Sequence, residues 1–151
     1  MLETATRRRV VILAFPGVQM LDVTGPSEVF SLADRFHGPA YTLELVGVPA
    51  GARGPRLAPE TPTVPPPPIP ASSGLRLLPD RTLAACRGPI DTLIVPGGFG
   101  TKAAQHDEAL IAWIRAAAAR SRRVASVCTG AFLLARAGRR DGRRATTHWA
   151  S

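Results

Sequence analysis

Residues 122 to 135 read Arg-Arg-Val-Ala-Ser-Val-Cys-Thr-Gly-Ala-Phe-Leu-Leu-Ala and place a thiol between two kinds of secondary structure. A short valine-rich run, residues 124 to 127, ends at Cys128, and apolar helix formers occupy residues 131 to 137. Strand, sharp turn and helix in this order are the pattern of a nucleophile elbow, here with cysteine. Such a turn exposes the thiol at a helix N-terminus, where unpaired N–H groups favour a thiolate. A buried structural cysteine is the alternative, because free cysteines are commonly buried.

The composition indicates one globular domain with a hydrophobic core. The chain has 151 residues, 45% of them hydrophobic and 20% charged. Its net charge of +8 raises the question of nucleic-acid binding. However, every basic residue except Lys102 is arginine, as in a GC-rich coding background, and no helix-turn-helix pattern is present. We interpret the two arginine clusters, at 7–9 and at 139–140 with 143–144, as solvated ends or loops.

The cysteines and the N-terminal sequence indicate in which cellular compartment the protein is expected. Cys86 and Cys128 form neither a C-x-x-C pair nor a zinc spacing, so no disulfide framework, metal site or cofactor is expected. The apolar run at residues 10–15 is too short for a signal peptide core or a membrane span. Reduced thiols are the default in the cytoplasm, which is the expected compartment, with no membrane partner.

Apolar runs alternate with helical patterns, which predicts an α/β fold with a mostly parallel sheet covered on both faces. Residues 22–26 are predicted as a turn, 72–78 as a short strand or hairpin arm, and 82–86 as one or two helical turns. The main strands are expected at residues 10–15, 41–48, 91–95 and 124–127, with a further strand at 144–147, and the helices at 26–35, 107–119 and 131–137.

A proline-rich insertion interrupts this pattern. Residues 49–70 contain nine prolines, including Pro65-Pro-Pro-Pro68, a density that excludes helix and sheet. The segment is predicted to be an exposed loop, partly polyproline II. A ligand for a proline-binding module is the functional alternative to a tolerated surface insertion.

Three loops follow predicted strands and should meet at the carboxyl edge of the sheet, where α/β proteins place their sites. They are residues 16–26, 96–100 and 128–130. Gly97-Gly98 lets the backbone approach a bound group, and its amides could form half of an oxyanion hole, with the amide of Thr129 or Gly130 as the other half. An ordinary glycine turn is the alternative.

Four segments together resemble the ThiJ/PfpI superfamily, whose domain is similar to that of class I glutamine amidotransferases. The resemblance covers nearly the whole chain except the proline-rich insertion, and implies a flavodoxin-like three-layer α/β/α sandwich over residues 1–151. The matching segments are Ala14-Phe-Pro-Gly-Val-Gln-Met-Leu-Asp-Val-Thr-Gly-Pro-Ser-Glu-Val-Phe30, Asp91-Thr-Leu-Ile-Val-Pro-Gly-Gly98, Arg123-Val-Ala-Ser-Val-Cys-Thr-Gly-Ala131 and Arg144-Ala-Thr-Thr-His-Trp149.

Two branches of the superfamily share these sequence motifs. One is the amidotransferase-like N-terminal domain of AraC-type, GlxA-like transcriptional regulators; the other is isonitrile hydratase, which adds water to an isocyanide to give an N-substituted formamide. Residues 30–35, 72–80 and 87–93 are more similar to the regulator branch. The resemblance therefore implies a sensor domain that binds an unidentified small molecule and reaches DNA only through a C-terminal helix-turn-helix module outside this chain.

The hydratase branch implies roles for particular residues. Cys128 as thiolate would attack the terminal isocyanide carbon. Asp22 would move protons or position water, and Thr129 would donate a hydrogen bond through its hydroxyl or amide. Relatives also place an acid near the thiol from the first helix, here Glu28. The alternatives are a turn or cap residue for Asp22 and a solvated helix residue for Glu28.

This chain also departs from the family pattern. Thr129 stands where protease-like members carry histidine, which argues against peptidase activity. His148 could align with the superfamily histidine or be a packed histidine near a sheet end. Arg139-Arg140 replaces the usual apolar pair and could disturb closure of the domain.

The assembly and the extent of the domain are expectations drawn from the same resemblance. Both branches continue past Trp149 with further strands and a helix, so the domain is expected to be incomplete at its C-terminal end and to expose a sheet edge. A homodimer is common in the superfamily. A redox-responsive protein that uses Cys128 as an oxidation sensor is a third functional hypothesis.

Overall fold

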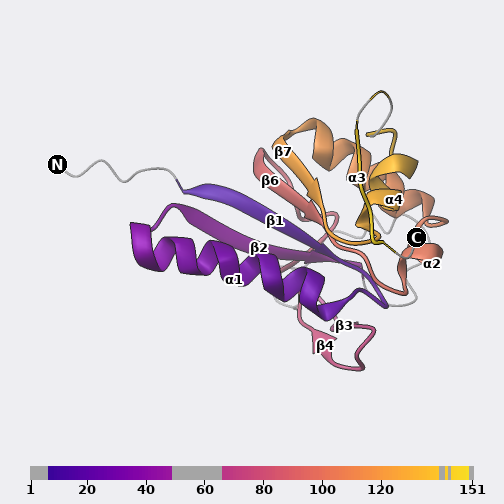
Figure 1. Cartoon of the computed structure of the whole chain (residues 1–151), viewed down its shortest axis with the longest axis horizontal. Helices are drawn as coiled ribbons and strands as arrows, with labels where there is room; N and C mark the ends of the chain where they lie inside the picture. The colour runs from indigo at the N-terminus through magenta and orange to yellow at the C-terminus, as the bar shows by residue number, and fades with distance from the viewer. Residues whose placement is uncertain (1–6, 49–65, 140–141, 143, 150–151) are drawn as a thin grey trace.

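A five-stranded parallel sheet organises the protein (Figure 1). The computed structural model describes residues 7–48, 66–139, 142 and 144–149. The sheet order is β5-β2-β1-β6-β7, and each neighbouring pair is parallel. The strands are β1 (Arg8–Ala14), β2 (Tyr41–Gly47), β5 (Arg81–Thr82), β6 (Ile90–Val95) and β7 (Ser121–Ser126), and the short strands β3 (Ile69–Pro70) and β4 (Arg76–Leu77) form a separate antiparallel pair.

Helices cover both faces of the sheet, which confirms the flavodoxin-like three-layer prediction. From β1 the chain runs outward through α1 (Met20–His37) to β2, and from β6 it runs the other way through α3 (Glu108–Ala119) to β7. Right-handed crossovers in opposite directions place their helices on opposite faces. Figure 1 shows α1 on one side and α3 with α4 (Gly130–Arg136) on the other.

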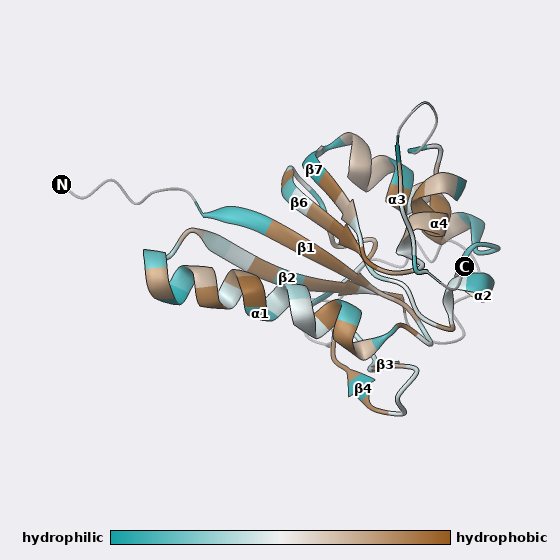
Figure 2. Ribbon diagram, viewed as in Figure 1, coloured by the Kyte–Doolittle hydropathy of each residue, from teal (hydrophilic) through white to brown (hydrophobic). Residues whose placement is uncertain are grey.

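The central strands form the core, as their uninterrupted apolar sequences predicted. Residues 10–14 of β1 are all buried, and so are residues 92–95 of β6. Hydrophobic residues run along both strands in Figure 2. From α3, Leu110, Ile111 and Ile114 pack against this sheet as one helical face. Asp107 caps that helix by accepting a hydrogen bond from the Leu110 amide at 3.0 Å.

The first helix differs from the prediction, because it begins at Met20 and contains Pro26. The predicted turn at residues 22–26 was therefore wrong. A proline inside a helix removes the bond to the carbonyl four residues earlier. Here two hydroxyls donate to neighbouring helix carbonyls: Thr24 Oγ1 to Met20 O at 3.1 Å and Ser27 Oγ to Thr24 O at 2.8 Å. Neither bond replaces the donor that Pro26 fails to supply to the Asp22 carbonyl, and the helix continues through the proline with Val23 buried in the core.

Four further segments differ from the sequence expectations. The helix α2 (Thr101–Ala104) was not predicted, and β7 begins three residues early, at Ser121. Residues 69–70 form β3 inside the predicted proline-rich loop, whose residues 49–65 lie outside the described residues. Residues 144–147 join no strand, so the predicted fifth strand there was wrong. Among the described residues, β7 is the last strand on its side of the sheet.

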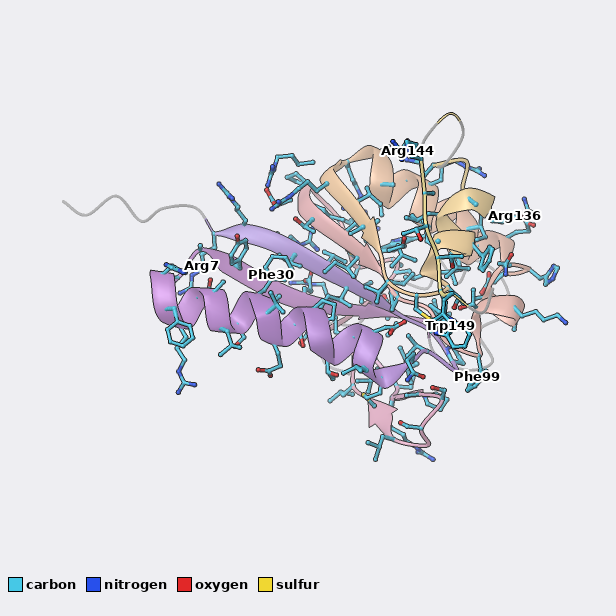
Figure 3. All side chains as sticks on the ribbon, in the orientation of Figure 1. Arg7, Phe30, Phe99, Arg136, Arg144 and Trp149 are labelled. Carbon is cyan, nitrogen blue, oxygen red and sulfur yellow. The ribbon has the colours of Figure 1, made fainter. Side chains whose placement is uncertain are left out.

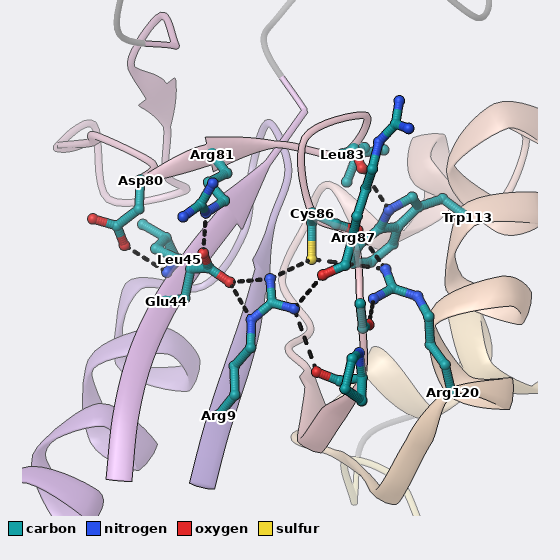
Figure 4. A network of polar contacts seen from close by, with 12 residues as sticks. Arg9, Glu44, Leu45, Asp80, Arg81, Leu83, Cys86, Arg87, Trp113 and Arg120 are labelled. Atoms are coloured by element: carbon teal, nitrogen blue, oxygen red, sulfur yellow. Dashed lines mark hydrogen bonds and ion pairs between the residues drawn. The ribbon is translucent and has the colours of Figure 1, made fainter. Parts of the chain in front are cut away.

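Arg9 is not the solvated residue that its cluster suggested, because its guanidinium enters a polar network (Figure 4). Its Nε donates to the buried Glu44 at 2.8 Å, and its Nη2 donates to Cys86 Sγ at 3.3 Å. Arg81 pairs with the other Glu44 oxygen. A buried carboxylate on β2 needs such partners, so Arg9 serves the fold and is not available to a phosphate.

Among the described residues, no helix combines the length and the apolar character that a bilayer crossing requires.

An ion pair between β6 and β7 gives a pH test of the fold. Arg122 donates two hydrogen bonds to Asp91, at 2.6 and 2.9 Å, and these bonds lower the pKa of Asp91 below its ordinary value of 3.8. A lowered pKa stabilises the folded state above the unfolded-state pKa, and the contribution fades as pH falls below it. We expect Asp91→Asn to lower Tm at neutral pH, with the gap to the unmodified protein narrowing below pH 3.8.

The control for this test is Glu108→Gln, which breaks the exposed ion pair with Arg136. It should change Tm far less at every pH. A Tm gap for Asp91→Asn that stays constant under acid would contradict the electrostatic explanation.

Candidate functional site

The candidate site lies where the chain leaves β1 and β6 in opposite directions, the topological switch point of the sheet. Two backbone hydrogen bonds join the loops after these strands: Gln19 N donates to Gly97 O at 2.9 Å, and Gly100 N donates to Gly17 O at 2.9 Å. Gly98 has φ +128°, and a Cβ there would lie 2.3 Å from Gln19 N. Glycine is therefore required for the loops to approach this closely.

Cys128 occupies the elbow that the sequence predicted. Its φ of +54° is the one positive value at a non-glycine residue in the described part of the chain. Cross-strand bonding fixes the turn, because Val127 N donates to Val95 O at 3.0 Å and Gly130 N returns to Val127 O at 3.0 Å. The residue is half-buried, not sealed in the core. Left-handed backbone at a non-glycine residue costs about 1–3 kcal/mol and is held by its surroundings.

Asp22 joins α1 to the glycine loop. Its carboxylate is buried, with 8% of the residue exposed, and Oδ2 accepts a hydrogen bond from Gly97 N at 3.0 Å. The helix N-cap is Gln19, which makes no side-chain cap bond. Asp22 therefore bonds the glycine loop and does not cap its own helix. This contact differs from the turn or cap role that was the alternative interpretation of Asp22.

Thr129 joins the elbow to the same loop. Its Oγ1 accepts from Gly98 N at 3.0 Å and lies 3.0 Å from Thr101 Oγ1. Thr101 is buried at the start of α2, and its amide donates to Gly98 O at 3.0 Å. Sequence reasoning missed Thr101; the signal available was a threonine directly after the Gly97–Gly100 segment.

The expected oxyanion donors are already engaged. Gly97 and Gly98 donate to Asp22 and Thr129, and Gly130 donates to Val127. In the described part of the chain, the Thr129 amide is the candidate donor left without an acceptor. The structure thus brings Cys128, Asp22, Thr129 and both glycines into one cluster of loops, but aims the glycine amides at protein oxygens.

The remaining predicted site residues are Glu28 and His148. Glu28 is exposed on α1. His148 is half-buried, with its ring centroid 5.4 Å from that of Trp149. The neighbouring Thr147 Oγ1 donates to Cys128 O at 3.1 Å, which fastens this segment to the elbow. Trp149 and Phe99 are both about nine-tenths exposed at this end of the molecule (Figure 3).

Within the residues that the structure describes, no three histidine, cysteine, aspartate or glutamate side chains gather as metal ligands.

Comparison with known proteins places this arrangement in a family. The model of the DJ-1/PfpI family matches residues 8–151. The chain belongs to the DJ-1/PfpI family. A crystal structure of a ThiJ/PfpI family protein from Pseudomonas syringae superposes with a TM-score of 0.77 at 26% identity, covering 97% of this chain and 52% of that one. The parallel sheet, the glycine loop after β6 and the cysteine elbow are thus elements of a DJ-1/PfpI domain.

Curated relatives of this DJ-1/PfpI chain include an enzyme and transcriptional regulators. It is 42% identical over 146 residues to the uncharacterized protein in cpoL 5′region of Streptomyces lividans, covering 97% of this chain and 91% of that protein. It is 36% identical over 142 residues to isonitrile hydratase of Pseudomonas putida, covering 94% and 53%. It is 29% identical over 137 residues to the HTH-type transcriptional regulator CdhR of Pseudomonas aeruginosa, covering 91% and 35%. The chain therefore spans about half of the hydratase and a third of the regulator.

The close approach of the loops predicts an asymmetric response to two alanine substitutions. A Cβ at Gly97 would lie 2.4 Å from Thr129 Oγ1 and 2.5 Å from Thr129 N. We expect Gly97→Ala to lower the free energy of unfolding by about 1–3 kcal/mol, because a packed loop must move. Urea unfolding followed by circular dichroism measures this loss.

Gly25→Ala is the control, since a Cβ in the middle of α1 meets Leu21 Cδ1 at 4.0 Å and no other loop. Alanine is the better helix former, but its Cβ would crowd the ring of Pro26, so this variant should change the free energy of unfolding by less than about 1 kcal/mol. Equal losses for the two variants would contradict the contact between the glycine loop and the elbow.

Proposed function

We propose that this chain is the ligand-binding domain of a transcriptional regulator, of the AraC type that its motifs resemble. It binds a small molecule at the elbow, and a helix-turn-helix module outside this chain contacts DNA. Relatives of both kinds, regulators and a hydratase, support the proposal at the level of the domain. The observation that favours binding over catalysis is the engagement of both glycine amides by Asp22 and Thr129.

That observation matters because catalysis through an oxyanion requires donors aimed at the developing charge. Here the Gly97 and Gly98 amides donate hydrogen bonds to Asp22 and Thr129, and these bonds hold three loops together. A ligand that contacts Cys128 or Thr129 would act on all three loops at once, since each is bonded to the next. A sensor needs such a connection between its ligand and the rest of the domain.

The second candidate is an isonitrile hydratase-like enzyme. The strained backbone of Cys128 and the buried carboxylate of Asp22 favour it, together with 36% identity to the hydratase. In this mechanism the Cys128 thiolate attacks the terminal isocyanide carbon. Asp22 positions water and transfers protons, and Thr129 donates a hydrogen bond from its amide.

One set of variants separates the two candidates. Under the binding proposal, an aryl isocyanide is turned over no faster by the unmodified chain than by Cys128→Ala, as followed by formamide production. Turnover that is lost in both Cys128→Ala and Asp22→Asn would establish the hydratase instead. For binding, small molecules that raise Tm should also slow alkylation of Cys128 by iodoacetamide. The buried Cys86 is the internal control for that reaction.

We also propose a homodimer, the assembly common in the superfamily, formed through α1. Leu21, Val29, Leu32 and Phe36 are exposed large apolar residues on this helix, and their spacing of three to four residues, counting Gly25, makes one stripe. An antiparallel pairing of two such helices would place Leu21 near Phe36 and Gly25 opposite Leu32. The stripe is then self-complementary, as a two-fold interface requires.

Sedimentation velocity tests this assembly. Leu32→Glu should convert the dimer to a monomer, because a charge would be buried against the facing helix. Leu78→Glu changes an exposed leucine away from α1 and should remain dimeric. A monomer for the unmodified chain, or a dimer for Leu32→Glu, would contradict the proposed interface.

A further inference from the structure

The hydroxyl of Thr129, the residue after Cys128, is bonded by the protein on two sides. Its Oγ1 accepts a hydrogen bond from Gly98 N at 3.0 Å and lies 3.0 Å from the hydroxyl oxygen of Thr101. A hydroxyl has one proton to donate and two lone pairs that accept. The two contacts therefore take two of the three directions around Oγ1. Among the described residues no further group bonds Oγ1, so the third direction is left for a ligand or water.

The burial of Thr101 decides which hydroxyl donates to the other. Thr101 is only 4% exposed, whereas Thr129 is half-buried. In the described part of the chain, Thr129 Oγ1 is the one partner of the Thr101 hydroxyl. If Thr129 donated, the Thr101 proton would be left unpaired inside the protein, which is unfavourable, whereas the Thr129 proton can reach water or a ligand. Thr101 therefore donates, and both lone pairs of Thr129 Oγ1 are filled.

The backbone holds Thr101 in this arrangement. Its amide donates to Gly98 O at 3.0 Å, and its carbonyl accepts from Gln105 N at 3.0 Å. Gly98 thus bonds both threonines, through its C=O to Thr101 and through its N–H to Thr129. The three residues form a closed ring of hydrogen bonds in which only the Thr129 proton points outward. Two bonds donated to one oxygen also polarise its own O–H and make that group a stronger donor.

We propose that Thr101 is a positioning residue that makes the Thr129 hydroxyl a donor, and not an acceptor, toward a ligand at the elbow. This inference rests on the proposed binding of small molecules beside Cys128. It defines their chemical class: the ligand places a hydrogen-bond acceptor, such as a carbonyl or carboxylate oxygen, against Thr129. A molecule that presents an N–H or O–H there is rejected, because Thr129 could accept it only by leaving the buried Thr101 proton unpaired.

Proton NMR observes the two hydroxyl protons directly. In the unmodified protein, the Thr101 hydroxyl proton should exchange slowly with water, because it is buried and bonded. The Thr129 hydroxyl proton should exchange as fast as that of a solvent-accessible threonine. This measurement needs no ligand, so its result is independent of whether the proposed function is correct.

Two reagents that alkylate Cys128 test the selectivity. Iodoacetate offers only acceptor oxygens beside the sulfur, and 2-bromoethylammonium offers only N–H donors. In both reactions the thiolate sulfur bonds to the CH2 carbon as the halide leaves. Mass spectrometry gives the rate at Cys128, with the buried Cys86 as internal control and N-acetylcysteine as the reference for each reagent.

Thr101→Val keeps the shape of the side chain and removes its hydroxyl. Thr129 can then turn its proton inward without leaving a buried donor unpaired, so the donor reagent is no longer rejected. The rate with 2-bromoethylammonium should rise at least about threefold, and the rate with iodoacetate should change less than about twofold. Thr101→Ser retains the hydroxyl and should restore the original selectivity.

Thr92→Val is the matched control. Thr92 is a second buried threonine, in β6, and its hydroxyl donates to Asp91 Oδ1 at 2.8 Å and not to the elbow. The same loss of a buried hydroxyl at this position should leave both alkylation rates at Cys128 unchanged.

Three results would overturn the proposal. A slowly exchanging Thr129 hydroxyl proton in the unmodified protein would show that Thr129 donates to Thr101, and this result does not depend on the folding of any variant. Equal slowing of both reagents in Thr101→Val would reduce Thr101 to a structural contact. Unchanged rates with both reagents in that variant would show that Thr101 does not control what Thr129 accepts.

Discussion

Two glycine amides control how the loops at the carboxyl edge of the sheet fit together. Gly97 N–H is bonded to the carboxylate of Asp22 from α1, and Gly98 N–H to the hydroxyl of Thr129 from the elbow. Each bond joins segments far apart in sequence and satisfies a polar group that is buried or partly buried, where an unmet donor costs about 1–3 kcal/mol. The loops after β1, β6 and β7 are consequently packed as one unit. A β-carbon added at Gly97 would collide with Thr129, and one added at Gly98 would collide with Gln19.

The strain at Cys128 depends on this unit. A left-handed backbone at cysteine is unfavourable by itself, yet bonds on both sides fix it: Val127 to Val95 before the turn, and Thr147 to the Cys128 carbonyl after it. The geometry leaves the side chain half-buried at the sheet edge. Backbone strain that the surroundings hold at one residue is typical of functional sites, and this observation supports the proposal that the thiol takes part in binding or catalysis.

The sequence was sufficient for the parts of the fold governed by local pattern. The apolar run at residues 10–15 identified β1, the short β-rich segment 91–95 before Pro96-Gly97 identified β6, and apolar periodicity identified α3. The start of α1 was missed because Pro26 was assigned to its first turn, whereas the helix continues through the proline with Val23 packed in the core, a contact that no local pattern reveals. Arg9 was misjudged for a related reason: its partner Glu44 lies 35 residues away, and such pairings are set by strand register.

The residues of the candidate site were predictable from the sequence, but their hydrogen bonds were not. Its members Cys128, Asp22, Thr129 and Gly97-Gly98 were named from motif resemblance, and their loops do meet. What the sequence could not give was the direction of the amides. A free glycine amide and one bonded to a carboxylate have the same sequence, although only the first can stabilise an oxyanion. Thr101 was missed for the same reason, since its contribution is a hydroxyl contact across α2 and the elbow.

The hydrogen bond between Asp22 and Gly97 also constrains any chemistry at this site. To release the Gly97 amide toward a substrate, the buried carboxylate of Asp22 must lose its donor, and burial makes an unpartnered carboxylate expensive. A molecule that offers Asp22 a replacement donor, such as water, an amide or a hydroxyl, removes that cost and frees the amide in the same step. A molecule without a donor leaves the loops closed. Catalysis that uses the Gly97 amide therefore requires a second donor to reach Asp22, whereas a ligand bound at Cys128 or Thr129 leaves the bond between Asp22 and Gly97 in place.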